Sequence, residues 1–120
     1  MNSTLSNPPA VDTHFHVFEA HRAVPGSRYV PVYDAPYEAW LSQATAAGIR
    51  RGVLVQTSFL GTDNSWLVHE LQQHSDTLRG VAVVDSDAGI NDLAALHSHG
   101  IRGIRLNLAG RSLTSDPWQP

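Results

Sequence analysis

Four short apolar runs alternate with longer amphipathic stretches along the 120-residue chain. The runs lie at 10–14, 51–55, 79–83 and 102–106, and the last three are rich in valine, isoleucine and leucine. A short run that is apolar at nearly every position is typical of a strand buried on both faces of a parallel sheet. The last three runs also begin with Arg-Gly, so they form a loose internal repeat.

The stretches between these runs predict three helices. The first covers 36–47, the second follows a cap at Asp63 or Asn64, and the third opens at 91–92. Gly48 stands at the end of the first helix, where a left-handed cap is favoured. The predicted apolar faces are Trp40, Ala44 and Ala47 in the first helix, Leu67, Leu71 and His74 in the second, and Leu93 and Leu96 in the third, which stops at Gly100.

This β-α alternation indicates parallel strands joined by right-handed crossovers. The repeat measures 28 residues from Gly52 to Gly80 and 23 residues from Gly80 to Gly103. A (β/α)8 barrel averages about 31 residues per unit, and these compact units fit one. An open doubly wound sheet fits nearly as well, so periodicity alone leaves both architectures open.

The C-terminal residues contain a helix-start signal that is followed by almost no chain. Ser115-Asp116-Pro117 combines a capping side chain with proline at the first helical position, and three residues come after it. We therefore expect a chain truncated as a fourth helix begins. The expected organisation is a flexible N-terminal segment over 1–9 and a partial barrel domain over 10–120.

Composition narrows the classes of protein that fit. Charged residues make up 16%, below the usual share of about a quarter, which suggests that part of the surface is buried against something else. A net charge of −3 gives no basic surface for nucleic acid. Without cysteine there are no disulfides and no thiolate sites. A polar N-terminus and the lack of a long apolar run predict a cytoplasmic protein that has no membrane contact.

His14 and His16 are the sharpest candidates for chemistry. Alternation along a strand places both imidazoles on one face, about 6–7 Å apart along the backbone. Two imidazoles at the carboxyl end of a first strand can form half of a divalent-metal site, for which zinc needs three or four ligands in total. The alternative is a chance pair in a short loop, but the position at the end of an apolar strand favours a functional pair.

Arg105 is the second candidate, because a guanidinium within a buried strand needs an ion pair or an anion. Its planar fork matches a carboxylate, so we expect a carboxylate clamp on a face shared with Asn107. The alternative is an internal pair with Asp85 on the neighbouring strand. Arg111 is either a second clamp or a solvated charge. The other five histidines, in predicted helices or a polar loop, are not expected to bind a metal.

A family resemblance extends over much of the chain. The stretch Val11-Asp12-Thr13-His14-Phe15-His16-Val17-Phe18 resembles the first-strand signature of the amidohydrolase superfamily, in its amidohydrolase-2 branch. Five further stretches resemble lactonases of the 2-pyrone-4,6-dicarboxylate hydrolase group: 28–31, 55–58 with 61–64, 80–85 and 102–107. The resemblance covers residues 11 to about 111.

The resemblance implies that the chain is the N-terminal half, about four βα units, of a (β/α)8 barrel. It implies a hydrolase that opens a carboxylated lactone by attack of water at the carboxyl ends of the strands, as in the catabolism of aromatic compounds. His14 and His16 would line the reacting centre. The residues expected to hold the substrate carboxylates are Tyr29, Ser58, Arg105 and Arg111. Many members use zinc or a similar ion at such a pair, whereas the pyrone-dicarboxylate group works without one, so the metal stays open.

The chain also departs from the family pattern. The family's general base is an aspartate on the last strand, and no such strand follows here, so we expect the chain alone to be inactive. Half a barrel has two open edges, which suggests a homo-oligomer that covers them. The alternative functions are therefore a non-catalytic binding or scaffold module formed by a dimerising half-barrel, and an open sheet that binds a small ligand.

Overall fold

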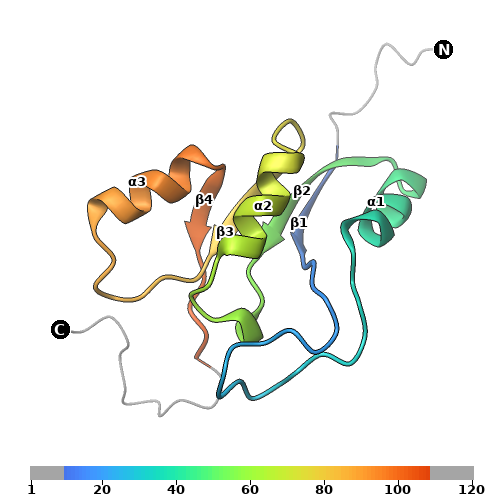
Figure 1. The fold of residues 1–120 in the computed structure, drawn as a ribbon. Coiled ribbons are helices and arrows are strands. Elements are labelled where there is room, and N and C mark those ends of the chain that lie inside the picture. Colours follow the sequence, from blue (N-terminus) through green and yellow to red (C-terminus); the bar gives the residue numbers. More distant parts are fainter. Residues whose placement is uncertain (1–9, 109–120) are drawn as a thin grey trace.

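The computed structural model describes residues 10–108 and shows a parallel four-stranded sheet with helices packed against it (Figure 1). The strands run in the order β1-β2-β3-β4. The elements are β1 (Ala10–Phe15), α1 (Tyr37–Ala46), β2 (Ile49–Val55), the 3-10 helix η2 (Ser58–Leu60), α2 (Ser65–Gln73), β3 (Leu78–Ala82), α3 (Ile90–Ser98) and β4 (Ile101–Ile104).

The strand order decides between the two architectures that the periodicity left open. A doubly wound sheet reverses its direction of growth beside the first strand, whereas here every crossover moves one strand further the same way. Right-handed crossovers in that order place α1, α2 and α3 on one face. The chain is thus α/β and has the topology of the first four units of a (β/α)8 barrel.

Helix ends agree closely with the sequence pattern, but two residues of the predicted apolar faces, Ala47 and Leu93, are exposed. Gly48 is left-handed, with φ of 75°, as predicted. Ala47 is exposed rather than part of the apolar face, because α1 ends one residue earlier. At α2, Asn64 occupies the cap position but its side chain makes no cap bond. Instead Asp63 Oδ1 accepts a hydrogen bond from the backbone N–H of Ser65, at 3.2 Å.

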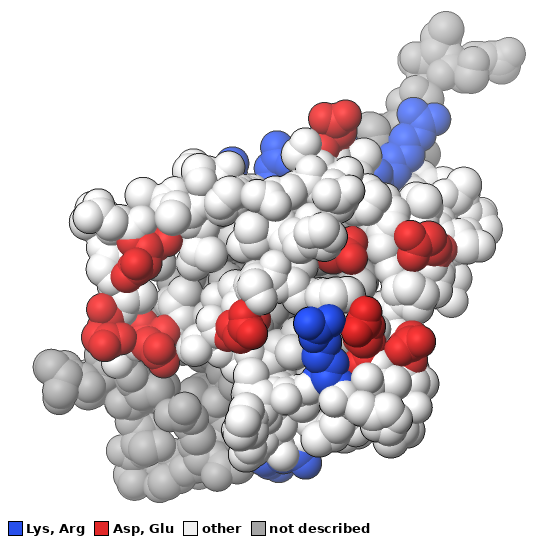
Figure 2. All heavy atoms as spheres, in the orientation of Figure 1, with Lys and Arg blue, Asp and Glu red and all other residues white. Residues whose placement is uncertain are grey.

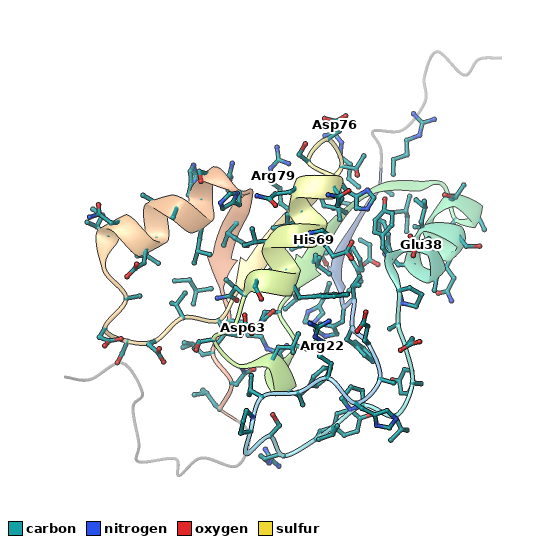
Figure 3. All side chains as sticks on the ribbon, in the orientation of Figure 1. Arg22, Glu38, Asp63, His69, Asp76 and Arg79 are labelled. Atoms are coloured by element: carbon teal, nitrogen blue, oxygen red, sulfur yellow. The ribbon has the colours of Figure 1, made fainter. Side chains whose placement is uncertain are left out.

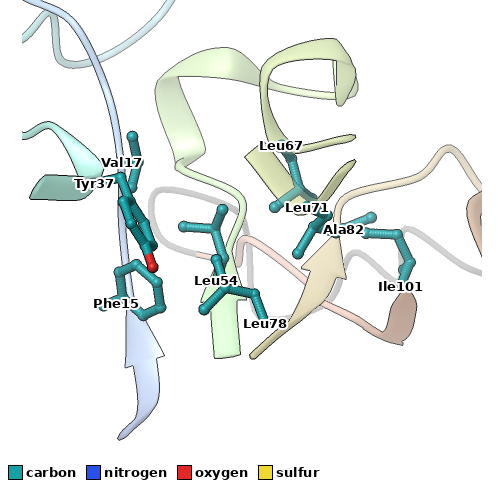
Figure 4. Close-up of a cluster of buried hydrophobic side chains, with 9 residues drawn as sticks. All are labelled: Phe15, Val17, Tyr37, Leu54, Leu67, Leu71, Leu78, Ala82 and Ile101. Carbon is teal, nitrogen blue, oxygen red and sulfur yellow. The ribbon is translucent and has the colours of Figure 1, made fainter. Parts of the chain in front are cut away.

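The hydrophobic core lies between the sheet and the helices (Figure 4). Two glycines of the Arg-Gly repeat make room for it. A Cβ on Gly52 would lie 2.7 Å from ring atoms of both Phe15 and Trp40, which stack with centroids 4.0 Å apart. Gly80 is equally crowded by side chains of the core. The buried cluster comprises Phe15, Val17, Tyr37, Leu54, Leu67, Leu71, Leu78, Ala82 and Ile101.

Two arginines of the repeat, Arg79 and Arg102, bind backbone carbonyls at or just after the C-terminus of the preceding helix. Arg79 Nη1 donates to Ser75 O, at 2.8 Å, just after α2. Arg102 Nη1 donates to His97 O, at 2.8 Å, near the end of α3. The bond from Arg102 adds to the one that His97 O accepts from Gly100 N–H at 3.0 Å, so both arginines reinforce helix ends. Helix-end bonds therefore explain Arg79 and Arg102, and close packing explains Gly52 and Gly80.

The two ends of the sheet carry different groups. Figure 3 places Asp76 and Arg79 at the amino end of the strands, and Arg22 and Asp63 at the carboxyl end. Arg22 pairs with Glu19 at 3.1 Å and lies 4.8 Å from the ring centroid of Trp66, which fixes the long β1–α1 loop against α2. On the face seen in Figure 2, charged side chains are sparse and mostly scattered. Within 10–108, no helix has the length and apolar character of a membrane span.

Several predictions fall on residues 1–9 and 109–120, which the structure does not describe. These are the flexible N-terminal segment, the second clamp at Arg111 and the helix start at 115–117. They stay predictions.

Candidate functional site

His14 and His16 meet at the carboxyl end of β1, as predicted. Their Nε2 atoms are 3.3 Å apart, and the rings contact edge to face with centroids at 4.9 Å. The β1–β2 register shifts between Asp12 and Phe15. Phe15 packs on the helix face against Trp40, so alternation directs the two flanking histidines to the opposite face.

Asp12 fixes this turn of the strand from the helix side. One carboxylate oxygen accepts the backbone N–H of His14 at 3.1 Å, and the other accepts the indole N–H of Trp40 at 2.8 Å. Asp12 is thereby engaged in holding α1 on the sheet. Its carboxylate serves a structural role in the motif rather than facing the two imidazoles.

The tautomer of His16 follows from its hydrogen bond. Nδ1 of His16 lies 2.8 Å from the carbonyl oxygen of Val55, which can only accept, so Nδ1 carries the hydrogen. Burial lowers the pKa of His16 below its ordinary value of 6.5. The neighbouring His14 and Arg105 lower this pKa too, against a raising effect of the bond to Val55. Neutral His16 therefore presents the lone pair of Nε2 towards His14.

The histidine pair fits part of a metal site. Two nitrogens bound tetrahedrally to zinc at about 2.0–2.1 Å lie about 3.3–3.4 Å apart, which agrees with the 3.3 Å between the Nε2 atoms. However, residues 10–108 contain no group of three or more His, Cys, Asp or Glu side chains arranged to hold a metal ion. The described residues thus supply two of four ligands and do not form a metal site by themselves.

Arg105 lies directly after β4, not inside the strand as the sequence suggested, because β4 ends at Ile104. Its backbone N–H donates to Ala82 O at 2.8 Å, and its Nη1 donates to Gln56 O at 2.8 Å. The alternative ion pair with Asp85 is not formed in the described part of the chain. The guanidinium therefore has no carboxylate partner there and retains free N–H donors.

Two successive carbonyls at the end of β2 bring these groups together. Val55 O accepts from His16, and Gln56 O accepts from Arg105. Successive carbonyls of a strand point to opposite neighbours. One carbonyl therefore binds His16 on the β1 side, and the next binds Arg105 on the β4 side. The charge of Arg105 is one of the causes that lower the pKa of His16.

A groove of about 690 Å³ opens beside this point. It is lined by three of the predicted substrate-binding residues, Tyr29, Ser58 and Arg105. A neighbouring hollow of about 470 Å³ shares Ser58 and Arg105 and extends to Asp85. The histidine pair does not line the groove, and the backbone of Val55 and Gln56 links it to Arg105, which does. The structure thus gathers every predicted site residue that it describes at the carboxyl end of the sheet.

Sequence reasoning missed two features of this groove. Arg28 lines it next to Tyr29, and the only signal was a basic residue beside an aromatic one in a loop. In the sequence Gln56 is a single polar residue after an apolar run, yet it is 2% exposed and donates two hydrogen bonds behind the groove. Neither role is visible without the loop conformation.

Comparison with known proteins agrees with this geometry. The family model Amidohydro_2, described as an amidohydrolase, matches residues 11–120. A 2-pyrone-4,6-dicarboxylate hydrolase of Comamonas testosteroni is 32% identical over 90% of this chain and 36% of its own length. A 4-sulfomuconolactone hydrolase of Hydrogenophaga intermedia is 31% identical over 82% of this chain and 33% of its own length. The chain spans about a third of these curated relatives.

Comparison with solved structures points to the same group of hydrolases. A protein from Acinetobacter baumannii, named as a probable 2-pyrone-4,6-dicarboxylic acid hydrolase with citric acid bound, has a TM-score of 0.80 and 39% identity, over 90% of this chain and 42% of its own. A Pseudomonas putida protein, provisionally named for the same activity, has a TM-score of 0.79 and 42% identity, over 92% and 42%. An Agrobacterium tumefaciens protein at 21% identity and a TM-score of 0.73 supports the fold alone.

The order of the strands, the histidine pair at the end of β1 and the family match over residues 11–120 point to one assignment. The chain belongs to the amidohydrolase family and corresponds to the N-terminal portion of its barrel members.

Proposed function

We propose that this chain supplies the N-terminal part of the active site of a lactone-opening hydrolase whose substrate is a carboxylated lactone of the 2-pyrone-4,6-dicarboxylate kind. The observation that carries the proposal is the meeting of His16 and Arg105 on successive carbonyls of β2. The same strand end thus anchors neutral His16, which contacts His14, and an arginine that has no carboxylate partner within residues 10–108.

In this proposal the arginine side of the site binds and orients the substrate. Arg105 holds a carboxylate through two parallel N–H donors, a geometry that a guanidinium favours. The phenol of Tyr29 and the hydroxyl of Ser58 add donors from the groove wall. Two lactonase relatives act on acidic lactones by name, which agrees with a cationic groove.

The histidine pair serves the reacting carbonyl. His16 stays neutral near pH 7, since burial lowers its pKa, and its Nδ1–H remains bound to Val55 O. The lone pair of His16 Nε2 accepts the hydrogen of His14 Nε2, and this bond orients both rings beside the lactone carbonyl. Activation of water needs a base that 10–108 do not place beside the pair, and we propose that the chain alone does not turn over substrate.

The test is a fused protein in which residues 1–108 replace the matching part of the Pseudomonas putida relative. Loss of the pyrone absorbance measures hydrolysis of 2-pyrone-4,6-dicarboxylate. We expect turnover by the fusion and none by the isolated chain. Arg105→Gln should raise KM by about tenfold to a hundredfold, as for a lost charge-assisted hydrogen bond, while His16→Gln should mainly lower kcat.

A matched control is Arg102→Gln, which removes a guanidinium of the same strand region that caps α3 at the opposite end of the sheet. We expect the control to leave KM unchanged. An Arg105→Gln fusion with the KM of the parent would contradict the proposal, and so would hydrolysis of the dicarboxylate by the isolated chain.

A second candidate is a non-catalytic binding or scaffold module in which two copies pair through their open edges. In the described residues β1 and β4 each have a neighbour on one side only, and Val11 on β1 is 47% exposed. Sedimentation of the purified chain tests it. A dimer with no lactonase activity after fusion would favour this module, whereas a monomer would count against it.

A further inference from the structure

We propose that Gln56 is a positioning residue that sets the shape of the substrate groove, by tying the loop that carries Ser58 to the strand end that holds Arg105. This inference rests on the proposed function, because it assigns a role within the same site. Gln56 itself does not line the groove and is not expected to touch the substrate.

The side chain of Gln56 closes the loop that follows β2. It is 2% exposed, and its Nε2 donates to Gly61 O at 3.0 Å and to Asp63 O at 2.8 Å. Both amide hydrogens are thereby used, so the amide orientation is fixed by the two carbonyls rather than chosen. The residues enclosed between donor and acceptors form η2, which begins at Ser58.

The backbone of Gln56 forms hydrogen bonds to β3 and to the residue that follows β4. Its N–H donates to Val81 O at 2.9 Å on β3, and its carbonyl accepts from Arg105 Nη1 at 2.8 Å after β4. The single buried residue Gln56 therefore holds the loop that carries Ser58 in position and orients the guanidinium of Arg105. A shift of residue 56 would displace both groove walls together.

A merely structural role makes a different prediction. If the two side-chain bonds only stabilise the fold, their loss lowers the free energy of unfolding but leaves the groove of the folded molecules unchanged. If Gln56 positions Arg105, the loss reduces affinity for a carboxylate in the folded state. That reduction must also vanish once Arg105 has been removed, because coupled residues are non-additive.

The test is a double-mutant cycle on the full 120-residue chain, with 2-pyrone-4,6-dicarboxylate as the probe in an NMR titration. Gln56→Met keeps the length of the side chain and removes both donors. We expect Kd to rise about tenfold in the parent background and less than about twofold in the Arg105→Gln background. Gln72→Met, on the exposed side of α2, is the matched control and should leave Kd unchanged.

Two further measurements keep the inference separate from the proposed function. The 15N relaxation of Arg105 Nε reports the order of the guanidinium without any ligand, and it should show greater mobility in Gln56→Met. If the parent chain does not bind the probe, the fusion test still decides the proposed function, and the relaxation data alone decide the role of Gln56. Gln56→Asn, whose shorter amide reaches at most one carbonyl, should give an intermediate result and serves if the methionine variant does not fold.

An equal rise in Kd in both backgrounds would overturn the inference, because it would show that Gln56 and Arg105 act independently. An ordered Arg105 side chain in folded Gln56→Met would overturn it as well.

Discussion

Replacing Gly52 by alanine tests how α1 packs on the sheet. The added methyl group would lie 2.7 Å from ring carbons of both Phe15 and Trp40, closer than nonbonded carbon atoms approach. These atoms belong to two stacked rings that are 9° from parallel, so neither ring can yield without moving the other. The indole N–H of Trp40 also donates to Asp12, so the movement strains that hydrogen bond.

The expected cost follows from these two contributions. Overpacking a close-packed site costs about 1–3 kcal/mol, and weakening one hydrogen bond to a carboxylate costs about 1 kcal/mol more. Alanine returns about 0.4–1 kcal/mol by restricting the unfolded chain. We therefore expect Gly52→Ala to lower the free energy of unfolding by about 1–3 kcal/mol.

Urea unfolding followed by tryptophan fluorescence measures this change, and Trp40 reports directly on the affected contact. Gly89→Ala is the matched control, because a Cβ there would have its nearest neighbour at 3.6 Å and no positive φ applies. We expect the control to lie within about 1 kcal/mol of the parent. A parental midpoint for Gly52→Ala would refute the packing argument, and so would an equal loss in the two variants.

Two further predictions concern His16 and Asn64. The pKa of His16 in the folded chain lies below its ordinary value of 6.5. As the pH falls, the unfolded chain therefore binds a proton first. The free energy of unfolding should thus decrease as the pH falls from about 7 through 6.5 towards the folded pKa. Urea midpoints at pH 7.5 and 5.5 should show a smaller decrease for His16→Gln than for the parent, and an identical decrease would contradict the assignment. Asn64→Ala removes both bonds to the Val83 backbone, at 2.8 and 3.2 Å, and should cost about 1–3 kcal/mol. Asn91→Ala on exposed α3 is its control, and equal midpoints would count against the argument.

Much of the fold could be read from local chemistry. The apolar runs that follow Arg-Gly became β2, β3 and β4, and Gly48 and Gly100 end helices because both adopt positive φ. Local patterns could not choose between a barrel and an open sheet, since that choice depends on which strands become neighbours. The family resemblance favoured the barrel before the strand order confirmed it.

The sequence indicated which residues gather at the site but not which hydrogen bonds hold them there. A two-residue period placed His14 and His16 together, and the cost of burying a guanidinium singled out Arg105. The interpretation of Asp85 as a partner failed because Arg105 lies past the end of β4 and finds a backbone carbonyl instead. Every residue has a backbone carbonyl, so a side chain that binds one needs no partner of a particular residue type. Neither the contact of Arg105 nor the role of Gln56 could therefore be predicted from the sequence.

The successive carbonyls of Val55 and Gln56 also determine where the chain can change length. Because the two carbonyls belong to adjacent residues, the histidine half and the arginine half of the site are held one residue apart along the strand. An extra residue in the surface segment 86–89 leaves this one-residue spacing unchanged. One extra residue between Val53 and Val55 turns both carbonyls to the opposite neighbouring strands, and one between Val55 and Gln56 turns them to the same side. Either insertion separates the two halves. Length variation among homologous chains should therefore accumulate in such segments and be absent from the last three residues of this strand end.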